Sequence, residues 1–173
     1  SSNLEISSKS LLLSDLIKFT KTAYKGPELF ILEKIIKEGD VIFNLKINYD
    51  ENGKIKDDYK IKGTIKDGKI QIFNNYIYEK INFIFILKKE EFKFQEINFA
   101  SNKINFFSDE VNVKKKKELF YIEGIVKNKD APLSKDFLKI VNYDLKNFNF
   151  DRTIFSSTNN FNFEINKNFK IKN

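Results

Sequence analysis

The chain has 173 residues, which fits one domain and is long enough to bury a core. It contains no Cys and no His, which excludes disulfides, thiolate metal sites and the histidine-based arrangements of nucleophilic enzymes. The net charge is +7, but Arg152 is the one arginine among 31 basic residues, which argues against sequence-specific reading of nucleic acid.

The start of the chain is polar and carries no initiator residue. Because the sequence begins at Ser1 and contains no Met, we expect a processed product or a piece of a longer chain. Any signal peptide or membrane anchor would then lie upstream. No stretch approaches the ~18 consecutive apolar residues of a transmembrane helix. The Ser-rich residues 1–9 predict a frayed start.

Two helical patterns follow within an N-terminal segment that we place at 1–40. Apolar residues at helical spacing predict a helix over 10–25, with Ser10 as the N-cap and Gly26-Pro27 as the stop. A second pattern covers 28–37, with Gly39 as the C-cap, although its second half can instead extend as a strand.

From Val41 to residue 127 the apolar period changes from 3.6 to 2, which predicts β-strands. Asn52-Gly53 and Asp67-Gly68 predict tight turns, and a change of face near Gln95–Glu96 predicts a bulge. The turns are short and no helix separates the strands, so the strands are antiparallel. The predicted strands are 41–49, 59–65, 70–72, 77–87, 92–99, 104–107, 111–113 and 119–126.

The last segment, 128–173, has a weaker pattern. Ser134 is a candidate N-cap for a short helix over 134–141. The segments 148–155 and 161–165 alternate again, but they are rich in Asn and predict weak edge strands or disorder. The fold class is therefore mainly β: an antiparallel meander curled into a groove or a sandwich, with N-terminal helices and one short helix near 134–141.

The sequence offers little for catalysis. The carboxylate pairs Asp57-Asp58 and Glu90-Glu91 lie in polar, turn-like contexts, where adjacent acids are usually solvated. No glycine-rich phosphate loop and no metal-ligand spacing is present. We predict that the chain is not an enzyme and uses no cofactor or metal.

Two other patterns have both a functional and a structural interpretation. The run Lys114, Lys115, Lys116 and Lys117 could contact phosphate headgroups, or it could be a solvated hairpin that blocks edge pairing. Phe and Lys mostly alternate, which places them on opposite faces of a sheet. The apolar face then either forms a sandwich core or lines an apolar groove.

The stretch 41–126 resembles the AsmA-like group of Gram-negative envelope proteins, which includes the TamB and YhdP types. The resemblance lies in VIFNLKINYDENGKI, YKIKGTIKDGKIQI, INFIFILKKEEFKFQEINFASNKINFFSDEV and LFYIEGIVKN. These segments share a cadence: a strand with a Gly-x-Ile/Val step, an Asp-Gly turn, and an Ile-Asn-Phe strand that opens the next unit. The cadence covers about half of the chain and contains no invariant catalytic residue.

The resemblance implies a segment of a long β-groove, apolar inside, that binds or conducts phospholipid between the inner and outer membranes. It implies a location in the periplasm or cell envelope, with an inner-membrane tether outside this chain. Acyl chains would be the main partner, and the membrane surface or other envelope proteins further ones. The residues expected to line the groove are Phe43, Leu45, Ile47, Ile61, Ile65, Ile70, Ile72, Ile81, Phe83, Phe85 and Leu87.

Two other functions remain open on the residues alone. The same apolar residues would form the dry core of a structural or protein-binding β-domain. A nucleic-acid binder is favoured by the net charge and disfavoured by the single Arg, so no specific nucleic-acid partner is expected.

Overall fold

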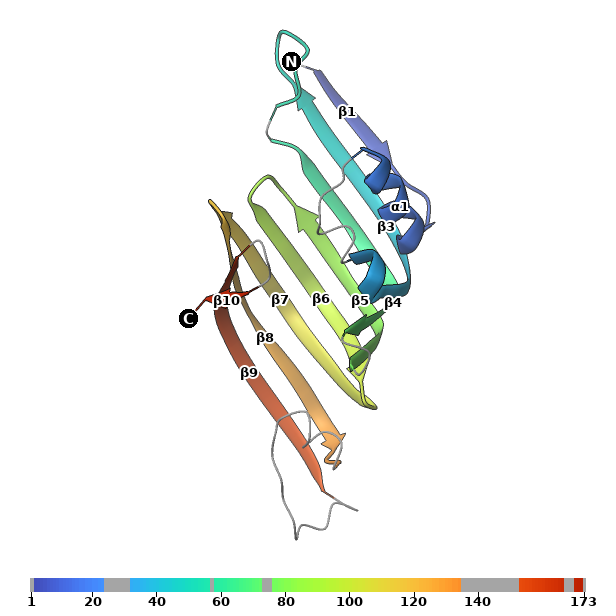
Figure 1. Cartoon of the computed structure of the whole chain (residues 1–173), viewed down its shortest axis with the longest axis vertical. Coiled ribbons are helices and arrows are strands. Elements are labelled where there is room, and N and C mark those ends of the chain that lie inside the picture. Colours follow the sequence, from blue (N-terminus) through green and yellow to red (C-terminus); the bar gives the residue numbers. More distant parts are fainter. Residues whose placement is uncertain are drawn as a thin grey trace.

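The chain folds into a single twisted sheet, shown by a computed structural model that describes residues 2–23, 32–56, 58–72, 76–134, 153–166 and 170–172. Every strand pair is antiparallel, and the long strands follow one another in sequence order (Figure 1). The strands in sheet order are β1 (Ser2–Ser7), β3 (Ile36–Tyr49), β4 (Lys60–Ile72), β5 (Tyr76–Leu87), β6 (Glu91–Ser101), β7 (Ile104–Lys116), β8 (Leu119–Pro132), β9 (Ile154–Asn166) and β10 (Ile171–Lys172).

This architecture confirms the predicted fold class, a mainly β antiparallel meander. All described strands belong to one sheet, and β1 and β10 stand at its two ends. The short strand β2 (Leu11–Leu12) pairs with β3 beside β1. The domain divisions expected at residues 40 and 127 fall inside β3 and β8, so the sheet runs continuously across both positions.

Bulges inside the strands bend the sheet. The bulge predicted near Gln95–Glu96 is confirmed, because Glu96 has a φ of 53° where the register between β5 and β6 shifts. The turn predicted at Asp67-Gly68 is wrong. Asp67 also has a positive φ of 49°, but it lies at a register shift within β4, which continues to Ile72. The gap expected near Ser108-Asp109 is likewise a register shift within β7.

The N-terminal residues differ in part from the prediction. The start that was expected to be frayed forms β1, because its six residues pair in register with β3. The helix predicted over 10–25 exists as α1 (Leu13–Ala23). Ser10 is not its N-cap, since β2 separates Ser10 from the helix. Asp15 in the first turn and Lys21 in the last turn complement the helix dipole.

The second helical pattern is shorter than predicted. Residues 32–35 are helical, and the strand alternative holds from Ile36, where β3 begins. Gly39 therefore lies inside β3, with a φ of 136°, and caps no helix. The predicted stop at residues 26–27, almost all of the helix over 134–141, and residues 148–152 lie outside the described residues. The segment 161–165 is part of β9.

Candidate apolar binding face

One face of the sheet carries an unbroken row of apolar side chains across neighbouring strands. Strand alternation places residues that are two apart on the same face, and residues that are directly paired share a face. Following the pairs from β1 to β9 gives the row Ile6, Leu45, Ile61, Leu87, Phe92, Val113, Ile122 and Phe163. We call this side of the sheet the apolar face.

All residues that the sequence predicted to line a groove lie on the apolar face. Helix α1 covers part of them, because Leu13 and Leu16 pack against the buried cluster Val41, Ile65 and Phe85. Phe43, Ile61, Phe83 and Leu87 also pack against this cluster. The half of the face formed by β3, β4 and β5 therefore contains a packed core, of which Val41 is 1% exposed.

The other half of the apolar face is more open. A pocket of about 240 Å³ lies over β6, β7, β8 and β9, and no charged or polar side chain lines it. The sequence predicted none of its residues as binding residues, although they follow the same alternation as those in β3 to β5. The lining residues are Phe92, Phe94, Val113, Phe120, Ile122 and Ile165. We call this cavity the β6–β9 pocket.

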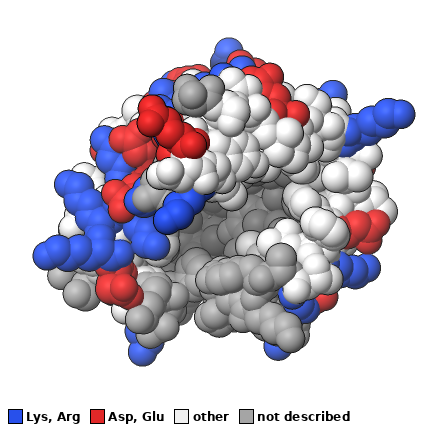
Figure 2. Space-filling view, turned by 90° about the horizontal axis from the view of Figure 1, so that it is seen from above, with Lys and Arg blue, Asp and Glu red and all other residues white. Residues whose placement is uncertain are grey.

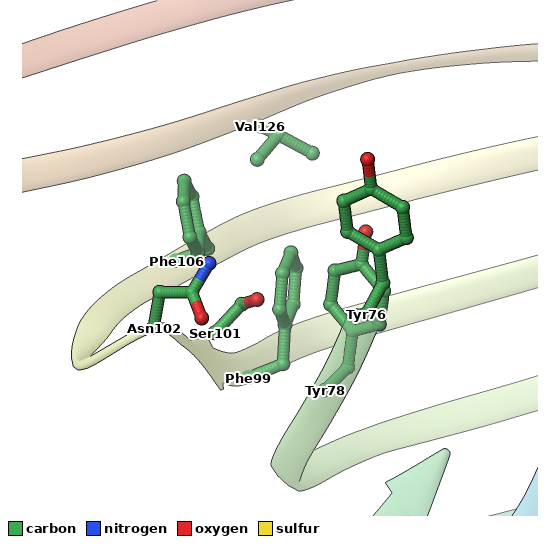
Figure 3. A pocket seen from close by; sticks show the side chains of 7 residues that line it. All are labelled: Tyr76, Tyr78, Phe99, Ser101, Asn102, Phe106 and Val126. Carbon is green, nitrogen blue, oxygen red and sulfur yellow. The ribbon is translucent and has the colours of Figure 1, made fainter. Parts of the chain in front are cut away.

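A second pocket of about 210 Å³ lies on the same face near the opposite ends of the strands (Figure 3). Its aromatic rings form a ladder: Phe99 stacks on Phe106 with ring centroids 5.1 Å apart, and Tyr78 meets Phe99 at 65°. Val126 of β8 and Tyr76 of β5 complete the walls, and Ser101 and Asn102 add neutral polar groups. We call this cavity the aromatic pocket.

The opposite face of the sheet is polar and carries an ionic network. Glu110 of β7 accepts hydrogen bonds from Lys93, Asn112 and Gln95, and the Lys93 Nζ to Glu110 Oε2 distance is 2.7 Å. The hydrogen bond from Lys93 is the main reason that the pKa of Glu110 lies below its ordinary value, with Asn112 second. This network couples β6 to β7 across solvent-facing positions of the polar face.

The predicted headgroup lysines do not form one cluster. Lys114 and Lys116 belong to the polar face, where the Lys116 Nζ lies 5.3 Å from the ring centroid of Tyr121. Lys115 belongs to the apolar face, and its Nζ lies 5.9 Å from the ring centroid of Phe120. Lys117 sits in the β7–β8 turn with a φ of 57°. Lys115 is therefore the member of the run that borders the β6–β9 pocket.

Seen along the long axis, the molecule is hollowed, and most of the charged side chains visible in this view lie around the outside of the hollow (Figure 2). Uncharged atoms form much of its visible border. The described residues contain no group of three or more acidic, His or Cys side chains placed to hold a metal ion. No helix among the described residues combines the length and the hydropathy needed to cross a membrane.

Comparisons with known proteins return no match to a family model, to a curated protein or to a solved structure. The AsmA-like resemblance of the sequence therefore stays a prediction.

Proposed function

We propose that this chain is a non-enzymatic binding module that holds a phospholipid acyl chain on its apolar face, as a segment of an envelope protein that conducts phospholipid between membranes. The observation that carries the proposal is the β6–β9 pocket, an open and wholly apolar cavity that borders the core under α1, with Phe94 belonging to both. Exposed apolar surface of this kind marks a binding site for an apolar partner.

The energetics fit an acyl chain. Each buried CH₂ group contributes about 0.8 kcal/mol, so a chain laid along the pocket would be held without any specific polar contact. Lys115 stands at the rim of the pocket, with its ammonium over the Phe120 ring, from where it can reach a phosphate oxygen. The proposal thus assigns Lys115, rather than the whole lysine run, to the headgroup.

Native mass spectrometry of the purified chain, with lipid extraction from the same sample, tests the proposal. We expect phospholipid to copurify in near-stoichiometric amount. Phe120→Asp puts a charge into the pocket and should abolish lipid retention. Ile125→Asp puts the same charge on the polar face of the same strand, where Ile125 is exposed, and should retain lipid.

A structural or protein-binding β-domain is the second candidate, and the core under α1 favours it, because there the apolar face is covered by the chain itself. In this case the folded wild-type protein would give a clean apo mass, and circular dichroism would show Phe120→Asp unfolded, because its charge would be buried, while Ile125→Asp stays folded. This result would refute the lipid-binding proposal.

A further inference from the structure

Along β8 and β9 the side chains on the apolar face change from apolar to polar. These strands pair without a register shift from Leu119 to Asn128, so side chains that are two apart on β8 stay on one face throughout this stretch. From the β7–β8 turn onward the face presents Phe120 and Ile122 and, further along the strand, Val126. Beside and beyond Val126 it presents polar groups, which we call the Asn–Ser cluster: Asn159, which pairs directly with Val126, and the pair Asn128 and Ser157, two residues further along.

The Asn–Ser cluster is built by hydrogen bonds. Ser157 donates its hydroxyl to the Asn128 side-chain oxygen, and Asn159 Nδ2 donates to Ser157 Oγ over 3.0 Å. Asn128, which is 3% exposed, donates from Nδ2 to the carbonyl oxygen of Phe155. Asn159 is exposed to solvent. Covering its amide with hydrocarbon would remove its water without supplying a new partner, which is unfavourable.

The distance between the two ends of the apolar stretch suits one acyl chain. Phe120 and Val126 are six residues apart on β8, which corresponds to ~20 Å of extended strand. The hydrocarbon core of a bilayer is about 30 Å thick, so one acyl chain spans about 15 Å. At the start of the stretch lies Lys115, which has no acidic partner among the described contacts. The stretch is thus basic at one end and neutral polar at the other.

We propose that the stretch between Lys115 and the Asn–Ser cluster is a length-selective site for a single acyl chain with an anionic end group. The anionic group meets Lys115, the chain runs along β7, β8 and β9, and its methyl end stops at Asn159. The inference rests on the proposed function and adds the orientation and the length of the chain. Asn159 is the specificity-determining residue of this site.

A series of saturated fatty acids from octanoate to stearate, measured by calorimetry on the full chain, tests the inference. Affinity should rise about fourfold for each added CH₂ and then level off when the chain reaches the Asn–Ser cluster. Asn159→Leu should move this plateau to a longer fatty acid. The control Asn160→Leu changes the neighbouring residue on the polar face and should leave the plateau in place.

The end group is tested separately. Lys115→Gln should weaken binding about two- to fivefold at every chain length, with the plateau unmoved, because the contact lies at an exposed rim. The matched change Lys114→Gln, on the polar face, should leave the affinity unchanged.

Two results would overturn the length-selective site while the proposed function stands. In the first, the affinity rises with chain length without a plateau. In the second, the plateau stays in place in Asn159→Leu. A plateau that moves in Phe99→Ala instead would place the methyl end in the aromatic pocket and would also overturn it (Figure 3). If folded protein binds no fatty acid of any length, the proposed function fails and the length-selective site fails with it.

Discussion

Two glycines show how single residues adapt the apolar face to its aromatic side chains. A Cβ on Gly63 would lie 2.4 Å from the Phe85 ring and 2.4 Å from the carbonyl oxygen of Ile42. A Cβ on Gly124 would lie 2.8 Å from the Phe161 ring. In both places a Phe ring from the adjacent strand lies over the glycine, so the missing side chain is replaced by aromatic packing.

Gly63→Ala should therefore destabilise the fold by about 3 kcal/mol, because the neighbouring backbone oxygen cannot move away as a flexible side chain could. Urea unfolding followed by circular dichroism measures the loss. Gly53→Ala is the control: its Cβ meets no atom within 4 Å, so only its φ of 76° opposes alanine, at a cost of about 1 kcal/mol. Equal losses for the two variants would contradict the packing argument.

The Glu110 network makes stability depend on pH. The pKa of Glu110 is lowered in the folded chain, so the carboxylate stabilises the fold at a pH above its unfolded pKa. This contribution is lost as the pH falls through the folded pKa. Glu110→Gln should thus lose less stability than the wild type between neutral and acid pH. Thermal melts across this pH range make the comparison.

Among the elements, α1 shows how a helix is held on the apolar face. Ile17 is 5% exposed, whereas Phe19, on the same helix, is 73% exposed. The helix therefore fixes itself through one side, with Leu13 and Leu16 reaching the Val41 cluster. The opposite side of the helix, which carries Phe19, stays in solvent.

Ile17→Ala should lower the free energy of unfolding by about 3 kcal/mol, because it opens a cavity under α1. Phe19→Ala should change it by no more than about 0.5 kcal/mol, since its ring is exposed. Denaturant unfolding of both variants, with the m-value as a check that the transition stays two-state, gives the comparison. A larger loss for Phe19→Ala would mean that the outer side of α1 is covered in solution.

The sequence predicted which segments form strands better than it predicted where each strand begins and ends. Alternation over 41–49 and 77–87 depends only on local pattern, and both stretches lie within β3 and β5. Asp67-Gly68 was misread because a residue with positive φ serves a turn and a bulge equally well, and only the partner strand decides between them. Strand β1 was missed because its short apolar pattern becomes informative only once β3 lies beside it.

At the scale of the whole molecule, the sequence predicted the apolar face but none of the residues that line its β6–β9 pocket. The alternation placed the predicted groove residues between Phe43 and Leu87 on one face of the sheet. It could not show that α1 covers the core that they form. The residues of the β6–β9 pocket carry the same signal in Phe92, Phe94 and Phe120. What no local pattern supplies is the pairing of distant strands, which places Ile165 beside Phe120 and so completes the pocket.

The charge of the whole chain predicts how ligand affinity depends on salt. At about 0.1 M salt, charges separated by more than about 10 Å are screened, so the net charge of +7 contributes little to holding a ligand on the apolar face. Acyl burial is not screened, and one exposed contact at Lys115 adds only a small ionic part. Fatty-acid affinity should therefore fall by less than about threefold between about 50 mM and about 200 mM salt.

A nucleic-acid binder would behave differently. If it made 6–10 phosphate contacts, its affinity would fall about a thousandfold or more over the same range of salt. Parallel titrations with palmitate and with a fluorescent single-stranded oligonucleotide separate the two, and tight, salt-sensitive oligonucleotide binding would identify the chain as a nucleic-acid binder instead.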